Sequence, residues 1–281
     1  MEIVRRIHSM REVCRQARAN GRKVGLVPTM GALHDGHLSL IRRVKELSDI
    51  VVVSIFVNPT QFGPQEDFDS YPRDLARDVD LCIAEGVDYV FAPTGEEMYP
   101  EGSETFVEVE RMSTILEGAS RPGHFRGVTT VVLKLLEIVQ PTVAAFGRKD
   151  MQQSVVVKRM VKDLMMEVEI LVLPVVRDED GVALSSRNRH LSPEQRRAAR
   201  AIPQAMESAK QAVAEGQRQP EKVLAAARDV LEAERLLQLD YLVLVDPETL
   251  KPVTQVEGEM VLLVAAKAGE VRLIDNVLVR G

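Results

Sequence analysis

The chain has 281 residues, enough for one large domain or two ordinary ones, and its apolar fraction of 45% is that of a globular protein. Its formal net charge of −6 argues against a broad nucleic-acid-binding surface. No apolar run could span a bilayer and the first residues lack the apolar core of a signal peptide, so we expect a cytoplasmic protein without a membrane partner. Cys14 and Cys82 match no metal or redox spacing and are expected to be inert thiols in a reducing compartment.

The first part of the chain alternates between helices and short apolar strands. Ser9 and Glu12 have the spacing of a capping box, which predicts a helix that ends near Asn20 and Gly21. We then expect strands over 23–27, 49–59 and 87–93, with helices over 37–47 and 74–86 between them. This β-α-β-α-β order predicts a parallel sheet with right-handed crossovers, whose ligands bind beyond the carboxyl ends of the strands.

The remainder of the chain continues the alternation and then changes in composition. We expect a peripheral strand over 106–111, a helix from about 128 to 140, a strand over 142–147, a helix over 151–164 and a strand over 166–176. Beyond Ser192 and Pro193, two helices over 193–215 and 220–236 precede three strands over 239–246, 259–268 and 270–279. The chain is therefore predicted to hold an α/β domain over 1–176 and a smaller α+β domain with an antiparallel sheet over 177–281.

The most informative stretch is PTMGALHDGHLSLI at 28–41, where a strand meets a helix. Its glycines permit tight turns and the close approach of a ligand to the backbone. The helix opens near Asp35 and Gly36, and backbone N–H groups at such an end bind phosphate. His34 and His37 lie three residues apart, so their rings fall on one side of the first turn. This arrangement predicts polyphosphate chemistry, while a zinc-binding pair and two structural histidines are the alternative interpretations.

Four further polar clusters are richer in functional groups than turns require. They are Asn58 and Gln61 in FVNPTQF, Arg121 and His124 in RPGHF, Lys149, Asp150, Gln152 and Gln153 in GRKDMQQ, and Ser185, Ser186 and Arg187 in ALSSRN. The last cluster carries three donors of the kind that phosphate oxygens accept. Each cluster by itself is also compatible with an ordinary turn, helix cap or surface loop.

The HxGH pattern resembles the signature of the nucleotidyltransferase superfamily. The ordered set PTMGALHDGHLSL, FVNPTQF, YPRD, RPGHFRGVTTVVLKLL, FGRKDMQQ and RDEDGVALSSRN resembles the pantoate–β-alanine ligases over essentially the whole chain. That resemblance implies that ATP, with Mg²⁺, drives the joining of (R)-pantoate to β-alanine through a pantoyl adenylate, with release of AMP and pyrophosphate. It also implies a Rossmann-like N-terminal domain, a C-terminal domain that acts as a lid, and a homodimer.

The resemblance further implies roles for residues at the matched positions. His37 matches the catalytic proton donor, and His34 and Lys149 match further catalytic contacts to the phosphates of ATP. The expected ATP-binding residues are Met30, Gly31, Ala32, Leu33, His34, Asp35, Gly36, His37, Gly147, Arg148, Lys149, Asp150, Val176, Leu184, Ser185, Ser186 and Arg187. The expected pantoate contacts are Gln61, Gln153 and Asn58, and the expected β-alanine contacts are Gln61, Arg121, His124 and Tyr71.

Chemistry adds detail to these roles. Met30 and Phe62 are expected to form an apolar wall for the two methyl groups of pantoate. We expect Arg121 to hold the β-alanine carboxylate as a bidentate pair and His124 to help remove a proton from the incoming amine. Mg²⁺ is expected to be carried by the triphosphate with few protein ligands, and no metal ligand is assigned.

Two other functions are compatible with the HxGH turn. A nucleotidyltransferase would form a stable nucleotidyl product, but the additional amide pair and the RPGHF loop argue against it. A catalytically silent nucleotide sensor would bind ATP without reacting, and the presence of His37 and Lys149 argues against that.

Overall fold

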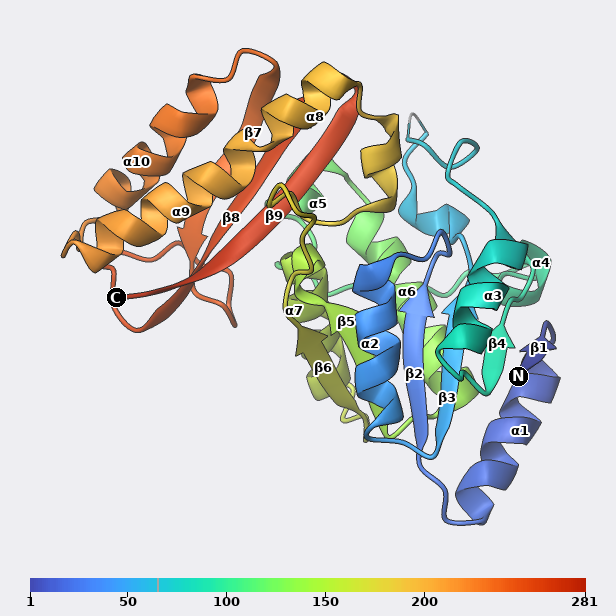
Figure 1. Ribbon diagram of the computed structural model, residues 1–281. Coiled ribbons are helices and arrows are strands. Elements are labelled where there is room, and N and C mark those ends of the chain that lie inside the picture. The colour runs from blue at the N-terminus through green and yellow to red at the C-terminus, as the bar shows by residue number, and fades with distance from the viewer. Residues whose placement is uncertain (65) are drawn as a thin grey trace. The chain divides into compact units, whose positions relative to one another are not determined.

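Two sheets organise the chain in this computed structural model, which describes residues 1–64 and 66–281 (Figure 1). The contacts separate the described chain into two units. Unit 1 comprises Met1–Gly147 and Gln152–Leu173, and unit 2 comprises Arg148–Met151 and Pro174–Gly281. The domain boundary expected at Val176 stays a prediction, and the short stretch Arg148–Met151 is assigned by its contacts to unit 2.

Unit 1 is built on a six-stranded sheet in which every pair of neighbours is parallel. Its strands are β1 (Glu2–Val4), β2 (Val24–Thr29), β3 (Ile50–Ile55), β4 (Tyr89–Phe91), β5 (Val143–Gly147) and β6 (Glu169–Leu173), in the spatial order β1-β4-β3-β2-β5-β6. Its helices are α1 (Ile7–Ala19), α2 (Asp35–Lys45), the 3₁₀ turn η1 (Pro59–Gln61), α3 (Leu75–Ala84), α4 (Gly95–Met98), α5 (Glu117–Ser120), α6 (His124–Val139) and α7 (Met151–Asp163).

The chain order places a topological switch beside β2. From β2 the chain runs to β3 and β4 on one side, and β5 and β6 lie on the other. Right-handed crossovers then place α2 and α3 on one face and α1, α6 and α7 on the opposite face, and Figure 1 shows α2 and α6 on opposite faces. Ligands of such sheets bind beyond the carboxyl ends of the strands at the switch, where the HxGH turn begins.

The core of unit 1 explains why these segments are strands and helices. β2 and β3 are apolar runs buried on both faces, as is typical of central parallel strands. Leu38, Ile41 and Val44 recur at helical spacing on α2 and pack against alternate residues of the strands, such as Val51 and Val53. The amphipathic helix α2 therefore anchors the HxGH turn to the sheet.

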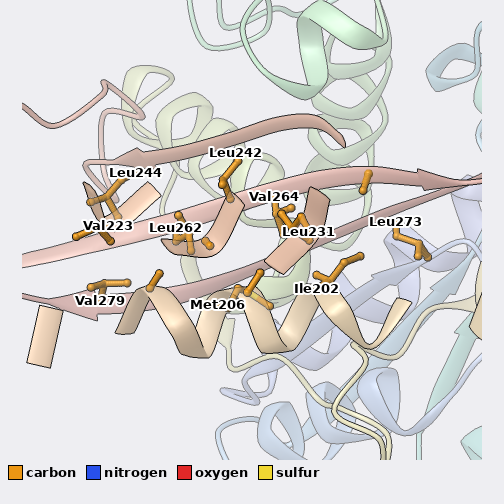
Figure 2. Packing of buried hydrophobic residues seen from close by; sticks show 14 of the residues in the cluster. Ile202, Met206, Val223, Leu231, Leu242, Leu244, Leu262, Val264, Leu273 and Val279 are labelled. Atoms are coloured by element: carbon orange, nitrogen blue, oxygen red, sulfur yellow. The ribbon is translucent and has the colours of Figure 1, made fainter. Parts of the chain in front are cut away.

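Unit 2 combines a three-stranded antiparallel sheet with a layer of helices. Its strands are β7 (Leu237–Val245), β8 (Glu259–Ala268) and β9 (Val271–Arg280), in the order β7-β8-β9. Its helices are the 3₁₀ turns η2 (Arg148–Asp150) and η3 (Ser186–His190), followed by α8 (Pro193–Ala199), α9 (Ala201–Ala214) and α10 (Pro220–Glu232). Figure 2 shows the apolar core between helices and sheet, where Ile202, Met206 and Leu231 meet Leu262 and Val264.

The predicted fold class, an α/β domain with a parallel sheet followed by a smaller α+β part, is confirmed. The strand predicted over 106–111 is wrong, because this segment pairs with no strand in the described part of the chain. The Val107 N–H instead donates to Thr130 Oγ1 at 3.0 Å, and the Val107 carbonyl accepts from Thr129 Oγ1 at 2.5 Å. Side chains of α6 thus satisfy backbone groups that a neighbouring strand would otherwise pair.

Two predicted helix starts are also corrected. α1 begins at Ile7, not Ser9, because the Ile7 N–H donates to Glu97 Oε1 at 2.8 Å, so a distant carboxylate replaces the local cap. α6 begins at His124, one turn before the apolar run, because Gly123 in the left-handed region starts the helix.

Three smaller differences concern segment ends and an unpredicted strand. The helix predicted over 193–215 is divided at Arg200, and the strand predicted over 166–176 is confined to 169–173. The edge strand β1 escaped prediction because only three residues pair. Such short or interrupted elements carry too few residues for a periodic pattern.

Both cysteines of the chain are buried and free. Burial raises the pKa of the Cys14 thiol to about 11 and that of the Cys82 thiol to about 12. Both thiols are therefore protonated near neutral pH, in keeping with the expectation of inert cysteines. Among the helices of the described residues, none combines the length and apolar character that a membrane crossing requires.

Candidate active site

The turn between β2 and α2 is held by a buried carboxylate. Asp78 of α3 is 1% exposed and accepts hydrogen bonds from the N–H groups of Ala32 and Leu33, both at 2.8 Å. The Gly31 N–H donates to Thr29 Oγ1 at 3.1 Å. Gly31 lies in the left-handed region with φ +82°, and a Cβ there would be 2.8 Å from Asp78 Oδ2, so the position requires glycine.

These hydrogen bonds change the role expected for the backbone N–H groups of residues 31–33. The N–H groups of Gly31, Ala32 and Leu33 are engaged within the protein, so the geometry does not support the expectation that these amides bind phosphate. Sequence reasoning missed Asp78. Its position in the sequence could have indicated a buried carboxylate, because Asp78 lies four residues before the buried Cys82 on the core-facing side of an amphipathic helix.

The rings of the two histidines of the HxGH turn lie against each other at the start of α2, tilted by 44°. Their ring centroids are 4.1 Å apart. His34 Nδ1 accepts from the Gly36 N–H at 3.2 Å, and His37 Nδ1 accepts from the His34 N–H at 3.4 Å. Because each Nδ1 accepts, the neutral form of each ring carries its hydrogen on Nε2. A Cβ at Gly36 would lie 2.8 Å from the His34 ring, so this glycine makes room for the pair of rings.

The NPTQ turn after β3 presents a side-chain amide next to Met30. Gln61 Nε2 donates to Met30 Sδ at 3.1 Å, and Gln61 Oε1 accepts from Asn58 Nδ2 at 3.1 Å. Asn58 is 1% exposed, and its Nδ2 also donates to the Gly127 carbonyl at 3.1 Å, while its Oδ1 accepts from the Thr60 N–H at 3.4 Å. The structure therefore brings Gln61 and Met30 together and gives Asn58 the role of orienting the Gln61 amide.

Aromatic side chains flank this turn. Phe62 makes edge contacts with Phe68 at 5.4 Å and with Tyr71 at 5.9 Å between ring centroids. Tyr71 is 7% exposed. The predicted contacts Phe62 and Tyr71 thus belong to one aromatic group beside Gln61, a surface suited to apolar parts of a ligand.

The RPGHF residues lie against the same turn. Arg121 forms a two-pronged ion pair with Glu66, with Nε to Oε1 at 2.6 Å and Nη2 to Oε2 at 2.7 Å. Its Nη1 lies 3.0 Å from His124 Nε2, and His124 Nδ1 lies 2.8 Å from the Gln61 carbonyl. Burial and the neighbouring Arg121 lower the pKa of His124 to about 4, so the ring is neutral at physiological pH.

The two glutamines of GRKDMQQ have different surroundings. Gln152 is 4% exposed, accepts from the Glu117 N–H at 3.0 Å, and donates to the carbonyls of Met112 at 3.0 Å and Ile115 at 2.7 Å. It therefore holds the loop before α5. Within the described part of the chain, the Gln153 side chain makes no hydrogen bond and is only partly buried. This contrast fits the predicted assignment of a ligand contact to Gln153 and not to Gln152.

The expected nucleotide residues of unit 2 are positioned by hydrogen bonds inside that unit. Asn276 of β9 is 2% exposed, and its Nδ2 donates to the carbonyls of Arg148 at 2.7 Å and Lys149 at 3.0 Å. Lys149 Nζ lies 3.6 Å from Asp150 Oδ1. Asn276 was not singled out from the sequence, because an asparagine inside a strand carries no local signal of its partner.

The loop of unit 2 that precedes η3 is folded back on itself. The Leu184 N–H donates to the Val176 carbonyl at 3.0 Å, so two predicted ATP contacts lie side by side. Ser185 caps η3 through a bond from the Arg187 N–H to its Oγ at 3.3 Å. At the base of the loop, Arg177 pairs with the buried Asp275 at 2.6 Å.

The two histidines do not belong to a group of metal ligands. Among the described residues, no three or more His, Cys, Asp or Glu side chains are grouped so that they could hold a metal ion. His34 and His37 each use Nδ1 to accept a backbone hydrogen bond.

Comparisons with known proteins agree with the motifs. A family model described as pantoate-beta-alanine ligase matches residues 2–278. A pantothenate synthetase of Moorella thermoacetica is 51% identical over 278 residues, which are 99% of this chain and 98% of that protein. The crystal structure of pantothenate synthetase from Thermus thermophilus matches with a TM-score of 0.96 at 46% identity, and the match covers 100% of both chains.

A second solved structure is that of a pantoate-beta-alanine ligase from Francisella tularensis, complexed with beta-gamma ATP and β-alanine. It matches with a TM-score of 0.82 at 35% identity over 99% of this chain and 97% of that chain. Because the family model and these relatives extend over nearly all of its length, the chain belongs to the pantoate-beta-alanine ligase family and is a ligase of that kind.

Proposed function

We propose that this chain uses ATP to join (R)-pantoate to β-alanine through a pantoyl adenylate, with release of AMP and pyrophosphate. Family membership supports the reaction, and one structural observation carries the proposal. Gln61 and Met30 lie together beyond the paired ends of β2 and β3. The same strand ends lead into the turn that carries the adjacent rings of His34 and His37 and into the turn that carries the NPTQ sequence. An amide beside a thioether suits a small acid with hydroxyl and methyl groups.

In the first step, a carboxylate oxygen of pantoate forms a bond to the α-phosphorus of ATP while the bond to pyrophosphate breaks. The main requirement is to stabilise negative charge on the phosphate oxygens, so positioned donors dominate. His34 and His37 supply Nε2–H donors, and His37 is the proposed proton donor. Lys149 supplies a compact positive charge.

In the second step, the neutral amine of β-alanine attacks the acyl carbon and AMP leaves. The amine loses a proton as the amide bond forms. Gln61 is the proposed contact for both pantoate and β-alanine, and Gln153 is the proposed second contact for pantoate. A β-alanine complex of the Francisella tularensis ligase supports the choice of amine.

The remaining assignments are proposals of the same kind. The further proposed ATP contacts are Met30, Asp35, Gly36, Gly147, Arg148, Asp150, Val176, Leu184, Ser185, Ser186 and Arg187. Mg²⁺ is proposed to enter with the triphosphate, which supplies most of its oxygen ligands. A cytoplasmic homodimer and the action of the C-terminal domain as a lid stay predictions.

The test of this function is product analysis with each substrate omitted in turn. AMP should accumulate only when ATP, pantoate and β-alanine are all present. With pantoate present and β-alanine absent, labelled pyrophosphate should exchange into ATP. A nucleotide conjugate formed without AMP would instead identify a nucleotidyltransferase. Pyrophosphate exchange that requires β-alanine would rule out the formation of pantoyl adenylate before β-alanine takes part.

A further inference from the structure

The hydrogen bonds of His124 determine which ring nitrogen carries its hydrogen. The Gln61 carbonyl can only accept, so Nδ1, 2.8 Å away, must donate. Nε2 of the neutral ring is then an acceptor, and it receives the hydrogen bond from Arg121 Nη1 at 3.0 Å. Both ring nitrogens are therefore occupied by protein groups, which leaves neither to take a proton from an incoming amine.

The guanidinium of Arg121 is occupied in the same way. Nε and Nη2 bind the two oxygens of Glu66, Nη1 binds His124, and Nη2 also lies 3.5 Å from the Gln61 carbonyl. The pairing edge that a substrate carboxylate would need already holds a protein carboxylate. The Arg121 and Glu66 side chains are only 16% and 25% exposed. The expected bidentate contact to β-alanine is therefore replaced by an internal ion pair.

Arg121 and His124 contact the turn η1, which is also held in place by close packing against α6. A Cβ at Gly127 would lie 2.3 Å from the Thr60 carbonyl oxygen and 2.6 Å from Gln61 Cα, so the start of α6 lies directly against η1. Asn58 bridges the two segments by donating to the Gly127 carbonyl. The main chain of Gln61 is thus fixed from the α6 side, while Asn58 fixes its side-chain amide.

We propose that Arg121 and His124 are positioning residues, which hold the Gln61 backbone so that its amide meets pantoate in the adenylation step, and that they do not capture the β-alanine amine. This inference rests on the proposed function, because it assumes that Gln61 binds the acid. The hydrogen-bond network that links Glu66, Arg121, His124 and the Gln61 carbonyl then holds the substrate-binding glutamine in position.

The test compares two substitutions of nearly equal size. In His124→Asn the amide nitrogen is bonded to Cγ as Nδ1 is, so it can still donate to the Gln61 carbonyl. In His124→Leu that donor is lost while the bulk remains. Arg126→Gln is the matched control, since Arg126 is on the same helix but is exposed and packs on Phe106. Thermal unfolding of each variant checks that it is folded.

Pyrophosphate exchange without β-alanine provides the activity readout. We expect His124→Leu to raise the KM for pantoate at least about tenfold with little change in the KM for ATP, and to impair exchange and ligation together. His124→Asn and Arg126→Gln should stay within about threefold of the unsubstituted enzyme. A His124→Leu enzyme that exchanges normally but no longer forms pantothenate would overturn the inference in favour of amine capture. An equal rise in the KM for pantoate in the His124→Asn and His124→Leu variants would also overturn the inference.

A spectroscopic measurement separates this inference from the proposed function. ¹⁵N NMR of histidine-labelled enzyme at neutral pH should show His124 with its hydrogen on Nδ1 and none on Nε2, whichever substrates the enzyme uses. The opposite tautomer would refute the network. If the unsubstituted enzyme shows no pantoate-dependent exchange while the tautomer is as expected, the proposed function fails and the network stands.

Discussion

The partly buried side chain of His124, which is bonded to the Gln61 carbonyl, makes the stability of the protein depend on pH. His124 has an ordinary pKa of 6.5, and burial together with the positive charge of Arg121 lowers its pKa to about 4 in the folded chain. The Gln61 carbonyl, Glu66 and Glu117 oppose this shift. Between these two pKa values the unfolded chain binds a proton that the folded chain excludes. The contribution of neutral His124 to the unfolding free energy is therefore fully present above the unfolded pKa. It is lost progressively as the pH drops through this window.

The size of the effect follows from the two pKa values. Going from pH 7.5 to pH 5, preferential protonation of the unfolded chain at His124 costs about 2 kcal/mol of unfolding free energy. His124→Asn removes this titration and keeps the donor to Gln61. The loss of unfolding free energy between the two pH values should be about 2 kcal/mol smaller in the variant than in the unsubstituted protein.

Urea unfolding of both proteins at the two pH values measures the effect. Most titrating groups are common to both proteins, so their contributions largely cancel in the double difference. His8→Asn makes the same substitution at an exposed residue of α1 and serves as the control. The same loss of stability in His124→Asn as in the unsubstituted protein would refute the neutral, desolvated state of His124.

Three further predictions concern other residues. Lys149→Ala should lower kcat/KM about a hundredfold, measured at subsaturating ATP, because a charge-assisted contact to the phosphates is lost; a value within about threefold of the unsubstituted enzyme would contradict this role. Gln153→Ala should raise the KM for pantoate far more than that for ATP without changing the urea midpoint. Gln152→Ala should instead lower stability by about 2 kcal/mol or more, because it removes three hydrogen bonds that hold the backbone of residues 112–117; the reverse pattern would mean that the two roles are exchanged. Asp78→Asn should raise the KM for ATP and cost about 2 kcal/mol of stability, because the new side-chain NH₂ group then faces one of the two backbone N–H groups that Asp78 accepts from. Unchanged kinetics and an unchanged urea midpoint would show that these two hydrogen bonds are dispensable.

The sequence by itself determined the fold class and the position of the HxGH turn. Apolar runs such as IVVVSI at 50–55 specify buried strands whatever surrounds them, and the stripe of Leu38, Ile41 and Val44 specifies one face of a helix. The order of the motifs was enough to indicate the family that the comparisons then confirmed. Periodicity and motif order are carried by residues close together in the chain, so no long-range contact is needed to recognise them.

Only the tertiary structure decided which polar groups bind one another. Asp78 holds a turn 46 residues earlier, and Glu97 caps a helix that begins 90 residues before it. Arg121, interpreted from the sequence as a substrate ligand, directs its hydrogen bonds to Glu66 and His124. A residue type states what a side chain can bond with, but burial and packing between distant segments select the partner. A buried polar group must find that partner within the protein, and its position in the chain does not reveal which one it will be.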